Sequence, residues 1–373
     1  MRKLFRIGLV LVLAVFLSLT SIVTAQDEPE LEGEIRMARA TWTTGHFQAA
    51  IFQQLLTEMG YDVEIIGEQG AVDFYQTVAE GEDVDMWANG WFPLHTGFAT
   101  IPDDDDEGRL QTLGRVMPVG FQIANGALQG YLIDKATADE YEITNLSQMA
   151  DPEIAALFDT DGDGLADLTG CNEGWGCAET INNTHLPEFE LEDSINHVQG
   201  DYALLMSETI NRYERGESIF FYTWTPNWTI NELVIGEDVV WLATPELEDV
   251  APLEGVDGCT EDPCNMGFIG NDIRAVANTD FLMENPAVAA LMSVVEIPLS
   301  DIAAQNIEMR EGEDSDEEVA EDAAEWIDDN RDLADEWLEF AFDNAENTDL
   351  VQEFLDEWLA EATGEEMEMS EDA

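Results

Sequence analysis

The feature that most constrains the fold is a regular alternation of short apolar runs with amphipathic segments after Glu34. Apolar runs at residues 35–40, 63–66 and 84–88 predict buried strands. Between them, apolar residues recur every three or four positions over 47–59 and 72–79, which predicts two helices that end at Gly60 and Gly81. Strands that alternate with helices favour a parallel sheet, so we expect an α/β fold.

Similar patterns continue to the C-terminus. Further strands are expected at residues 131–133, 219–222, 239–242, 268–269 and 274–277. The last third is expected to be helical, with apolar stripes that assign Trp326, Trp337 and Trp358 to the core. An acidic loop is expected at 311–318, and the chain should fray from 364 onward. A chain of 373 residues with this pattern is expected to form two domains.

The N-terminal 25 residues have the organisation of a secretory signal peptide. Arg2, Lys3 and Arg6 precede an apolar run at 8–19 and a small-residue cleavage site at 23–25. The apolar run is shorter than the ~20 residues that span a bilayer. The cleavage site has no cysteine to carry a lipid. We therefore expect cleavage near Ala25 and a free, exported, periplasmic protein.

The net charge is extreme, since 82 acidic residues face only 13 basic ones and the formal charge is −69. The acids are scattered through well-patterned segments, and the 45% hydrophobic content excludes a disordered polyanion. Such a surface repels itself in dilute buffer and is tolerated where the Debye length falls to ~3 Å, in molar salt. We expect a halophilic protein with a solvated acidic surface. Nucleic-acid binding is excluded because phosphates would be repelled.

The four cysteines form two close pairs in the sequence, Cys171 with Cys177 and Cys259 with Cys264. An exported chain favours disulfides over a zinc site. Four cysteines allow three connectivities, and proximity favours the two local bridges.

An aspartate-rich loop at 159–167 resembles the first half of a calcium loop. Asp159, Asp161, Asp163 and Asp167 occupy its positions 1, 3, 5 and 9, but position 12, which should be glutamate, is Gly170. An Asx-rich turn without a fixed ion is favoured over bound calcium. Both interpretations give the loop a structural role, so no metal ligand is assigned to the functional site.

Three tryptophans, Trp91, Trp175 and Trp224, each have Gly or Pro within two residues. A turn of this kind can present an indole to a cleft. Trp91 also follows a predicted strand, at the carboxyl end where α/β sheets bind ligands. Several indole faces around one point attract a quaternary ammonium group. The alternative is that each is a partly buried structural tryptophan.

His95 lies four residues after Trp91 in the same turn, where its imidazole can meet a ligand carboxylate, either as a neutral N–H or as an imidazolium. The other histidines, His46, His185 and His197, lack ligand spacing to one another. Motifs of hydrolases, phosphate-binding loops and zinc proteases are missing from the sequence. We expect neither an enzyme nor a cofactor.

Together, these motifs resemble the family of periplasmic glycine betaine/proline-betaine-binding proteins of osmoregulatory ABC importers. The segments that carry the resemblance come in family order and span the mature chain: Trp91-Phe-Pro-Leu-His95, Gln129-Gly-Tyr-Leu-Ile-Asp-Lys135, Phe158-Asp-Thr-Asp-Gly-Asp-Gly164, Ala166-Asp-Leu-Thr-Gly-Cys171, Gly174-Trp-Gly-Cys177, His197-Val-Gln-Gly200, Phe221-Tyr-Thr-Trp-Thr-Pro226 and Asp238-Val-Val-Trp-Leu242. The Cys259/Cys264 pair, the Trp-Phe-Pro turn and the acidity depart from the usual family pattern.

The resemblance implies a ligand site and a fold. The ligand-binding residues it implies are Trp91, Trp175 and Trp224 for the cation, and His95 with the backbone N–H groups of Gly176 and Cys177 for the carboxylate. It also implies a disulfide between Cys171 and Cys177 beside this site. The implied fold is a type II-like, two-lobed periplasmic-binding-protein fold, each lobe a central sheet flanked by helices, with a hinge between them. Lobe I would comprise 26–128 and 266–373, and lobe II 129–265.

The implied function is that of a monomeric receptor that binds glycine betaine or a related betaine for osmoprotection. It would deliver the ligand to the membrane permease of an ABC importer with its cytoplasmic ATPase. The alternative ligands are choline, carnitine and proline, and choline would leave the His95 contact idle because it has no carboxylate. A secreted, calcium-stabilised hydrolase is the rival from another class, but no nucleophile or acid–base pair stands out.

Overall fold

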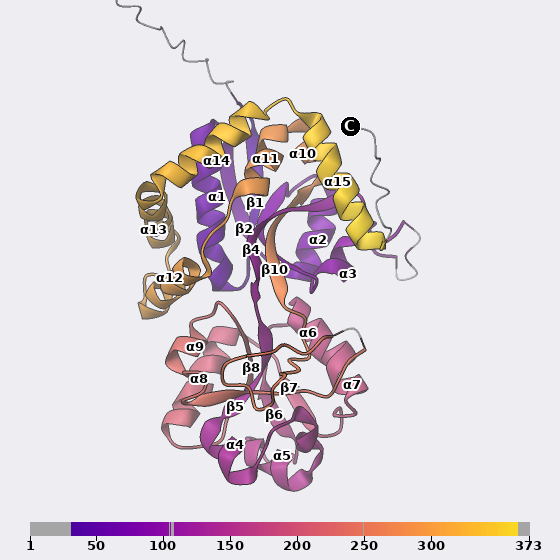
Figure 1. Ribbon diagram of the computed structural model, residues 1–373, viewed down its shortest axis with the longest axis vertical. Coiled ribbons are helices and arrows are strands. Elements are labelled where there is room, and N and C mark those ends of the chain that lie inside the picture. The colour runs from indigo at the N-terminus through magenta and orange to yellow at the C-terminus, as the bar shows by residue number, and fades with distance from the viewer. Residues whose placement is uncertain (1–30, 104, 106–107, 249, 365–373) are drawn as a thin grey trace, which may run out of the picture.

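The structure is a computed structural model that describes residues 31–103, 105, 108–248 and 250–364. Figure 1 shows two lobes stacked along the long axis, each with a five-stranded sheet flanked by helices. This arrangement confirms the predicted two-lobed α/β fold. We call the lobe that contains β1 the first lobe and the lobe that contains β5 the second lobe.

The sheet of the first lobe has the strand order β2-β1-β3-β10-β4. Strand β1 pairs in parallel with β2 and β3, whereas β10 runs antiparallel between β3 and β4. The strands are β1 (Glu34–Ala40), β2 (Asp62–Gln69), β3 (Met86–Phe92), β4 (Val116–Ala127) and β10 (Asn271–Asn278). A strand from near the C-terminal third therefore completes the N-terminal sheet.

The sheet of the second lobe has the order β7-β6-β8-β5-β9. Strand β6 pairs in parallel with β7 and β8, and β5 runs antiparallel to β8 and β9. The strands are β5 (Gln129–Asp134), β6 (Ala166–Thr169), β7 (Ile195–Val198), β8 (Phe220–Trp224) and β9 (Val239–Leu242). All of them come from one continuous stretch of chain.

Helices cover both sheets. Those of the first lobe are α1 (His46–Met59), α2 (Ala71–Glu80), α3 (Thr96–Ala99), α10 (Thr279–Glu284), α11 (Pro286–Val294), α12 (Leu299–Glu311), α13 (Asp316–Asp329), α14 (Arg331–Asp343) and α15 (Thr348–Thr363). Those of the second lobe are α4 (Lys135–Tyr141), α5 (Pro152–Phe158), α6 (Gly176–Thr180), α7 (Leu186–Glu188), α8 (Tyr202–Glu214) and α9 (Thr229–Glu232). Short 3₁₀ turns, η1 (Thr43–Gly45) and η2 (Leu146–Ala150), and one π-turn, η3 (Ile181–His185), complete the set.

The predicted helix ends and core tryptophans agree with the structure. Helices α1 and α2 end at Gly60 and Gly81, whose positive φ angles of 114° and 72° are strained for residues with a Cβ. Trp337 and Trp358 are buried on α14 and α15. Trp326 on α13 is half-buried and stacks on Trp337 with ring centroids 6.2 Å apart. The helical period identified these residues correctly.

The structure differs from the prediction in one strand and in one loop. Residues 268–269 do not form a strand: Phe268 packs its ring on His185 at 4.5 Å, and Ile269 is exposed. This segment instead leads the chain back to the first lobe, so its apolar residues do not pair in a sheet. The acidic loop is shorter than predicted, because α12 continues to Glu311 and a capping box at Ser315 starts α13 at Asp316.

Two segments connect the lobes (Figure 1). Leu128 alone separates β4 from β5, and its N–H and C=O bond to Thr225 of the second lobe. The return segment passes beside it, because a Cβ at Gly270 would lie 3.9 Å from the Leu128 side chain. The predicted signal peptide and the predicted fraying beyond Gly364 lie outside the described residues.

Among the described residues, no single helix is long and apolar enough to cross a membrane. Helices α11 and α12 pass that test only as a pair bent by 94°. In the first lobe α11 is buried and packs against β4, α14 and α15, as a core helix does.

Candidate functional site

A cavity between the two lobes brings together four tryptophans, Trp42, Trp91, Trp175 and Trp224. Each indole is at most 6% exposed. The cavity volume is about 30 Å³, room for about two water molecules. The complete lining is Trp42, Trp91, Leu94, His95, Gln129, Trp175, Gly176, Cys177, Tyr222 and Trp224. The structure thus brings all six predicted site residues to one cavity, and we call its four indoles the tryptophan box.

The first lobe supplies half of the tryptophan box and holds it with one amide. Trp91 is the second-last residue of β3 and Trp42 lies just after β1, so both lie at the carboxyl ends of adjacent parallel strands. Their indole N–H groups both donate to Oδ1 of Asn89, at 2.8 Å and 2.6 Å. The amide group of Asn89 donates in turn to Gln48, 2.8 Å away, which fixes its orientation. These two indoles are therefore held within one lobe.

The second lobe supplies Trp175 and Trp224. Trp175 precedes α6 as its N-cap residue, and Trp224 is the last residue of β8. Their rings meet edge to face at 5.6 Å, and Trp175 meets Trp42 of the first lobe in the same way at 5.4 Å. Their indole N–H groups donate across the interface to the hydroxyls of Thr41 and Thr44. The rings of Trp42, Trp175 and Trp224 consequently form one contiguous aromatic wall, and Trp91 lines the same cavity.

His95 offers a neutral N–H to the cavity. The backbone N–H of Trp91 donates to its Nδ1 at 3.1 Å, and the Tyr75 hydroxyl lies 3.2 Å from the same atom. Because Nδ1 accepts, the ring proton is on Nε2. Burial among aromatic rings lowers the pKa of His95 to about 3. The imidazole is therefore neutral at physiological pH, and of the two protonation states expected from the sequence the structure favours this one.

Two residues at the start of α6 in the second lobe, Gly176 and Cys177, line the same cavity as His95. Gly176 and Cys177 are the first two residues of α6, so their N–H groups have no acceptor within the helix. A Cβ at Gly176 would lie 3.1 Å from the His95 ring, which shows how closely the backbone approaches it. Cys177 is bridged to Cys171, and this disulfide, like the one between Cys259 and Cys264, agrees with the predicted pairing. Cys171 and Cys177 thus fix the segment that carries Trp175.

Four lining residues were not among the predicted site residues: Trp42, Leu94, Gln129 and Tyr222. The Tyr222 hydroxyl donates to Oε1 of Gln129 at 2.5 Å, and the Gln129 amide nitrogen is buried with no partner among the described residues. For Trp42 a signal existed, because it follows a predicted strand as Trp91 does. The contact between Gln129 and Tyr222 joins residues far apart in the sequence, and no local pattern predicts it.

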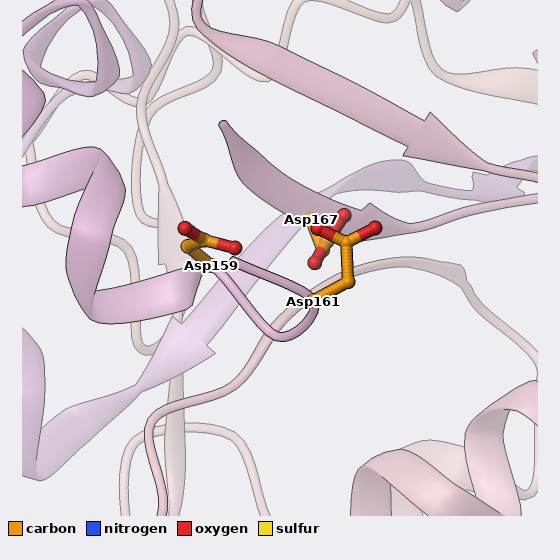
Figure 2. Close-up of side chains that lie close together, drawn as sticks. All are labelled: Asp159, Asp161 and Asp167. Carbon is orange, nitrogen blue, oxygen red and sulfur yellow. The ribbon is translucent and has the colours of Figure 1, made fainter. Parts of the chain in front are cut away.

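The aspartate-rich loop lies between α5 and β6, apart from the tryptophan box. Figure 2 shows Asp159, Asp161 and Asp167 turned toward one another, and one oxygen of each lies within 4.8 Å of the others. The N–H groups of Gly162 and Gly164 donate to Asp159, which lowers the pKa of that carboxyl. These bonds are those of an Asx-rich turn, the interpretation that the sequence favoured.

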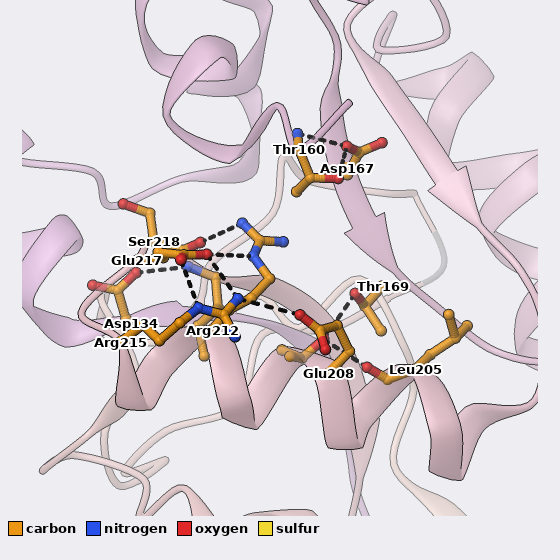
Figure 3. Close-up of polar contacts among 12 residues, drawn as sticks. Asp134, Thr160, Asp167, Thr169, Leu205, Glu208, Arg212, Arg215, Glu217 and Ser218 are labelled. Atoms are coloured by element: carbon orange, nitrogen blue, oxygen red, sulfur yellow. Dashed lines mark hydrogen bonds and ion pairs between the residues drawn. The ribbon is translucent and has the colours of Figure 1, made fainter. Parts of the chain in front are cut away.

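A groove over β6 and α8 contains two of the few arginines, Arg212 and Arg215 (Figure 3). Arg215 is bonded to Glu208 and Glu217, and Arg212 to Glu217 and to the Ser218 carbonyl. Their charges are thus paired with neighbouring acids, so the groove has no unpaired arginine to offer an anion.

Comparison with known proteins identifies relatives across most of the chain. The family model described as the substrate-binding domain of ABC-type glycine betaine transport systems (OpuAC) matches residues 33–329. The glycine betaine-binding periplasmic protein OusX of Dickeya dadantii is 39% identical over 322 residues, which are 86% of this chain and 94% of the relative. The glycine betaine/proline betaine-binding periplasmic protein of Escherichia coli is 38% identical over 330 residues, 88% and 96% of the two chains.

Solved structures share the fold at low sequence identity. The glycine betaine/L-proline-binding protein ProX of Borrelia burgdorferi aligns with a TM-score of 0.62 at 15% identity and covers 83% of this chain and 99% of its own. Lactococcal OpuAC in a closed complex with glycine betaine gives 0.58 at 18% identity, over 82% and 99%. A choline-binding protein with bound choline gives 0.62 at 18%, over 86% and 98%.

Proposed function

Because the chain belongs to the OpuAC family of substrate-binding domains of glycine betaine ABC transporters, we infer that it is the betaine receptor of such an importer. It binds a solute and passes it to a membrane permease, and it is not an enzyme. The observation that carries this function is one cavity that combines four indoles with a neutral imidazole and the first two N–H groups of α6, which have no acceptor within that helix. These groups match the two ends of glycine betaine.

The tryptophan box suits the trimethylammonium end. A quaternary ammonium has no N–H to donate, so it is held by ring faces, each contributing on the order of 1–2 kcal/mol where water is excluded. All four indole N–H groups are already bonded to Asn89, Thr41 and Thr44. The rings thus present their π systems to the ligand while their polar atoms stay satisfied.

The hydrogen-bond donors of the same cavity suit the carboxylate. The Nε2–H of His95 and the N–H groups of Gly176 and Cys177 are donors, and hydrogen bonds to a carboxylate are stronger than those between neutral groups. His95 comes from the first lobe and the two amides from the second. A ligand that binds both lobes favours the closed state, which the permease recognises.

The wider assignments follow from the same family. We place lobe I at residues 26–128 with 266–373 and lobe II at 129–265, so that the chain crosses near Leu128 and again before β10. The relatives are periplasmic proteins by name. Removal of residues 1–25 on export and a monomeric receptor complete the proposal.

The carboxylate donors favour glycine betaine over choline. A titration of tryptophan fluorescence with glycine betaine in molar NaCl, followed by competition with choline, tests this. We expect saturable binding of betaine and weaker competition by choline. Choline binding as tight as that of betaine would overturn the ligand assignment, and the absence of binding by any quaternary ammonium would overturn the function.

A further inference from the structure

Four residues between β1 and α1, Thr41 to Thr44, lie where the first lobe meets the tryptophan box. Thr44 is 4% exposed and Thr41 is half-buried, whereas Thr43 points to solvent. Three threonines of one short segment thus differ in their surroundings. Two of them accept hydrogen bonds from the other lobe.

The bonds come from the two tryptophans of the second lobe. The Trp175 indole N–H donates to Oγ1 of Thr41 at 2.7 Å, and that of Trp224 donates to Oγ1 of Thr44 at 3.4 Å. By contrast, the two first-lobe indoles are bonded to Asn89 of their own lobe. The indole hydrogen bonds of Trp42 and Trp91 therefore lie within one lobe, whereas those of Trp175 and Trp224 form only when the lobes meet. Within the second lobe these two rings contact Tyr202, at 6.0 Å and 4.7 Å, but no indole N–H acceptor of that lobe is seen among the described residues.

We propose that Thr41 and Thr44 are positioning residues that orient Trp175 and Trp224 as the lobes close, so that closing itself completes the cation site. When the lobes are apart, water can accept from both indole N–H groups. When they close, these donors leave water, and a buried donor without an acceptor is destabilising. The threonine hydroxyls remove that penalty and fix the rotation of each ring. The proposal rests on the proposed function, since it concerns the same ligand.

The test compares threonine-to-valine variants, because valine keeps the shape and removes the acceptor. Thr41→Val is expected to weaken glycine betaine binding about ten-fold and to speed its dissociation, with a smaller effect for Thr44→Val, whose bond is longer. Thr43→Val is the matched control on the same segment and should bind as the wild type does. Thr41→Ser restores the hydroxyl and should restore affinity.

Calorimetric titration gives the affinity, stopped-flow tryptophan fluorescence gives the dissociation rate, and melting without ligand separates a role in folding from one in closing. The melting temperatures of the ligand-free variants should match the wild type. The proposal is overturned if Thr41→Val binds as tightly as Thr43→Val, or if Thr41→Val fails to fold or melts early without ligand. Wild-type protein that binds no betaine would instead overturn the proposed function.

Discussion

Replacing Gly176 with alanine should separate ligand binding from folding. A Cβ at this position would lie 3.1 Å from Cδ2 of His95 and 3.1 Å from Cγ of Leu94, closer than ordinary contact. Both neighbours belong to the first lobe, whereas Gly176 begins α6 of the second. Overpacking of this degree costs about 1–3 kcal/mol. The cost arises only when the lobes close, so it should appear in the affinity, as a loss of roughly 5- to 150-fold.

The ligand-free protein should be unaffected or slightly more stable, since alanine favours a helix over glycine by up to ~1 kcal/mol. Gly97→Ala is the matched control, because Gly97 is exposed on α3 and a Cβ there meets nothing within 4 Å. Betaine titration calorimetry and thermal melting of both variants in molar salt provide the comparison. An alanine at 176 that leaves the affinity unchanged would refute the close approach of the lobes at this point.

Four further predictions concern the same site and the surface. Trp91→Ala should lower betaine affinity at least about ten-fold, measured by calorimetry, with little change in the melting temperature of the ligand-free protein. Burial lowers the pKa of His95 to about 3, so between pH 6.5 and 3 the unfolded chain binds a proton at this residue and the native state does not. The free energy of unfolding should therefore fall as the pH drops through this range. His95→Gln should reduce the dependence of that free energy on pH by about 1.4 kcal/mol per pH unit, measured by urea unfolding. A Cys171→Ser/Cys177→Ser double variant should lose about 2 kcal/mol of unfolding free energy in denaturant titrations and also bind betaine less tightly. The melting temperature should rise with NaCl while the betaine dissociation constant stays within about ten-fold, because the acids repel one another but the ligand has no net charge; flat stability from dilute buffer to molar salt would contradict the halophilic interpretation.

Much of the fold could be predicted from local patterns, and the failures have physical reasons. Strand β4 contains Pro118 and Gly120, which interrupt the apolar run, and it was not predicted. In the structure Gly120 has a positive φ of 67°, and a Cβ there would overlap the carbonyl oxygen of Met292 on α11. The local sequence thus serves a long-range backbone contact, so it lacks the pattern of an ordinary strand.

The site residues that local sequence could predict are aromatic or imidazole side chains that lie in a turn. Trp91 and Trp175 stand beside glycine, and His95 shares the turn of Trp91, so sequence reasoning placed them in one site. Trp42 is flanked by threonines, which favour strands and do not mark a turn as Gly or Pro does. Its role depends on Asn89 and on a tryptophan of the other lobe, and such contacts exist only once the chain has folded.

The position of β10 limits the order in which an emerging chain can fold. The second sheet uses strands from residues 129 to 242 and can assemble as soon as these have appeared. The first sheet must wait for Asn271–Asn278, and until then β3 and β4 each have an edge without its partner. Open edges invite pairing with other chains. A chain with a formal charge of −69 repels its own copies, so at low ionic strength its acidity disfavours such pairing during that interval.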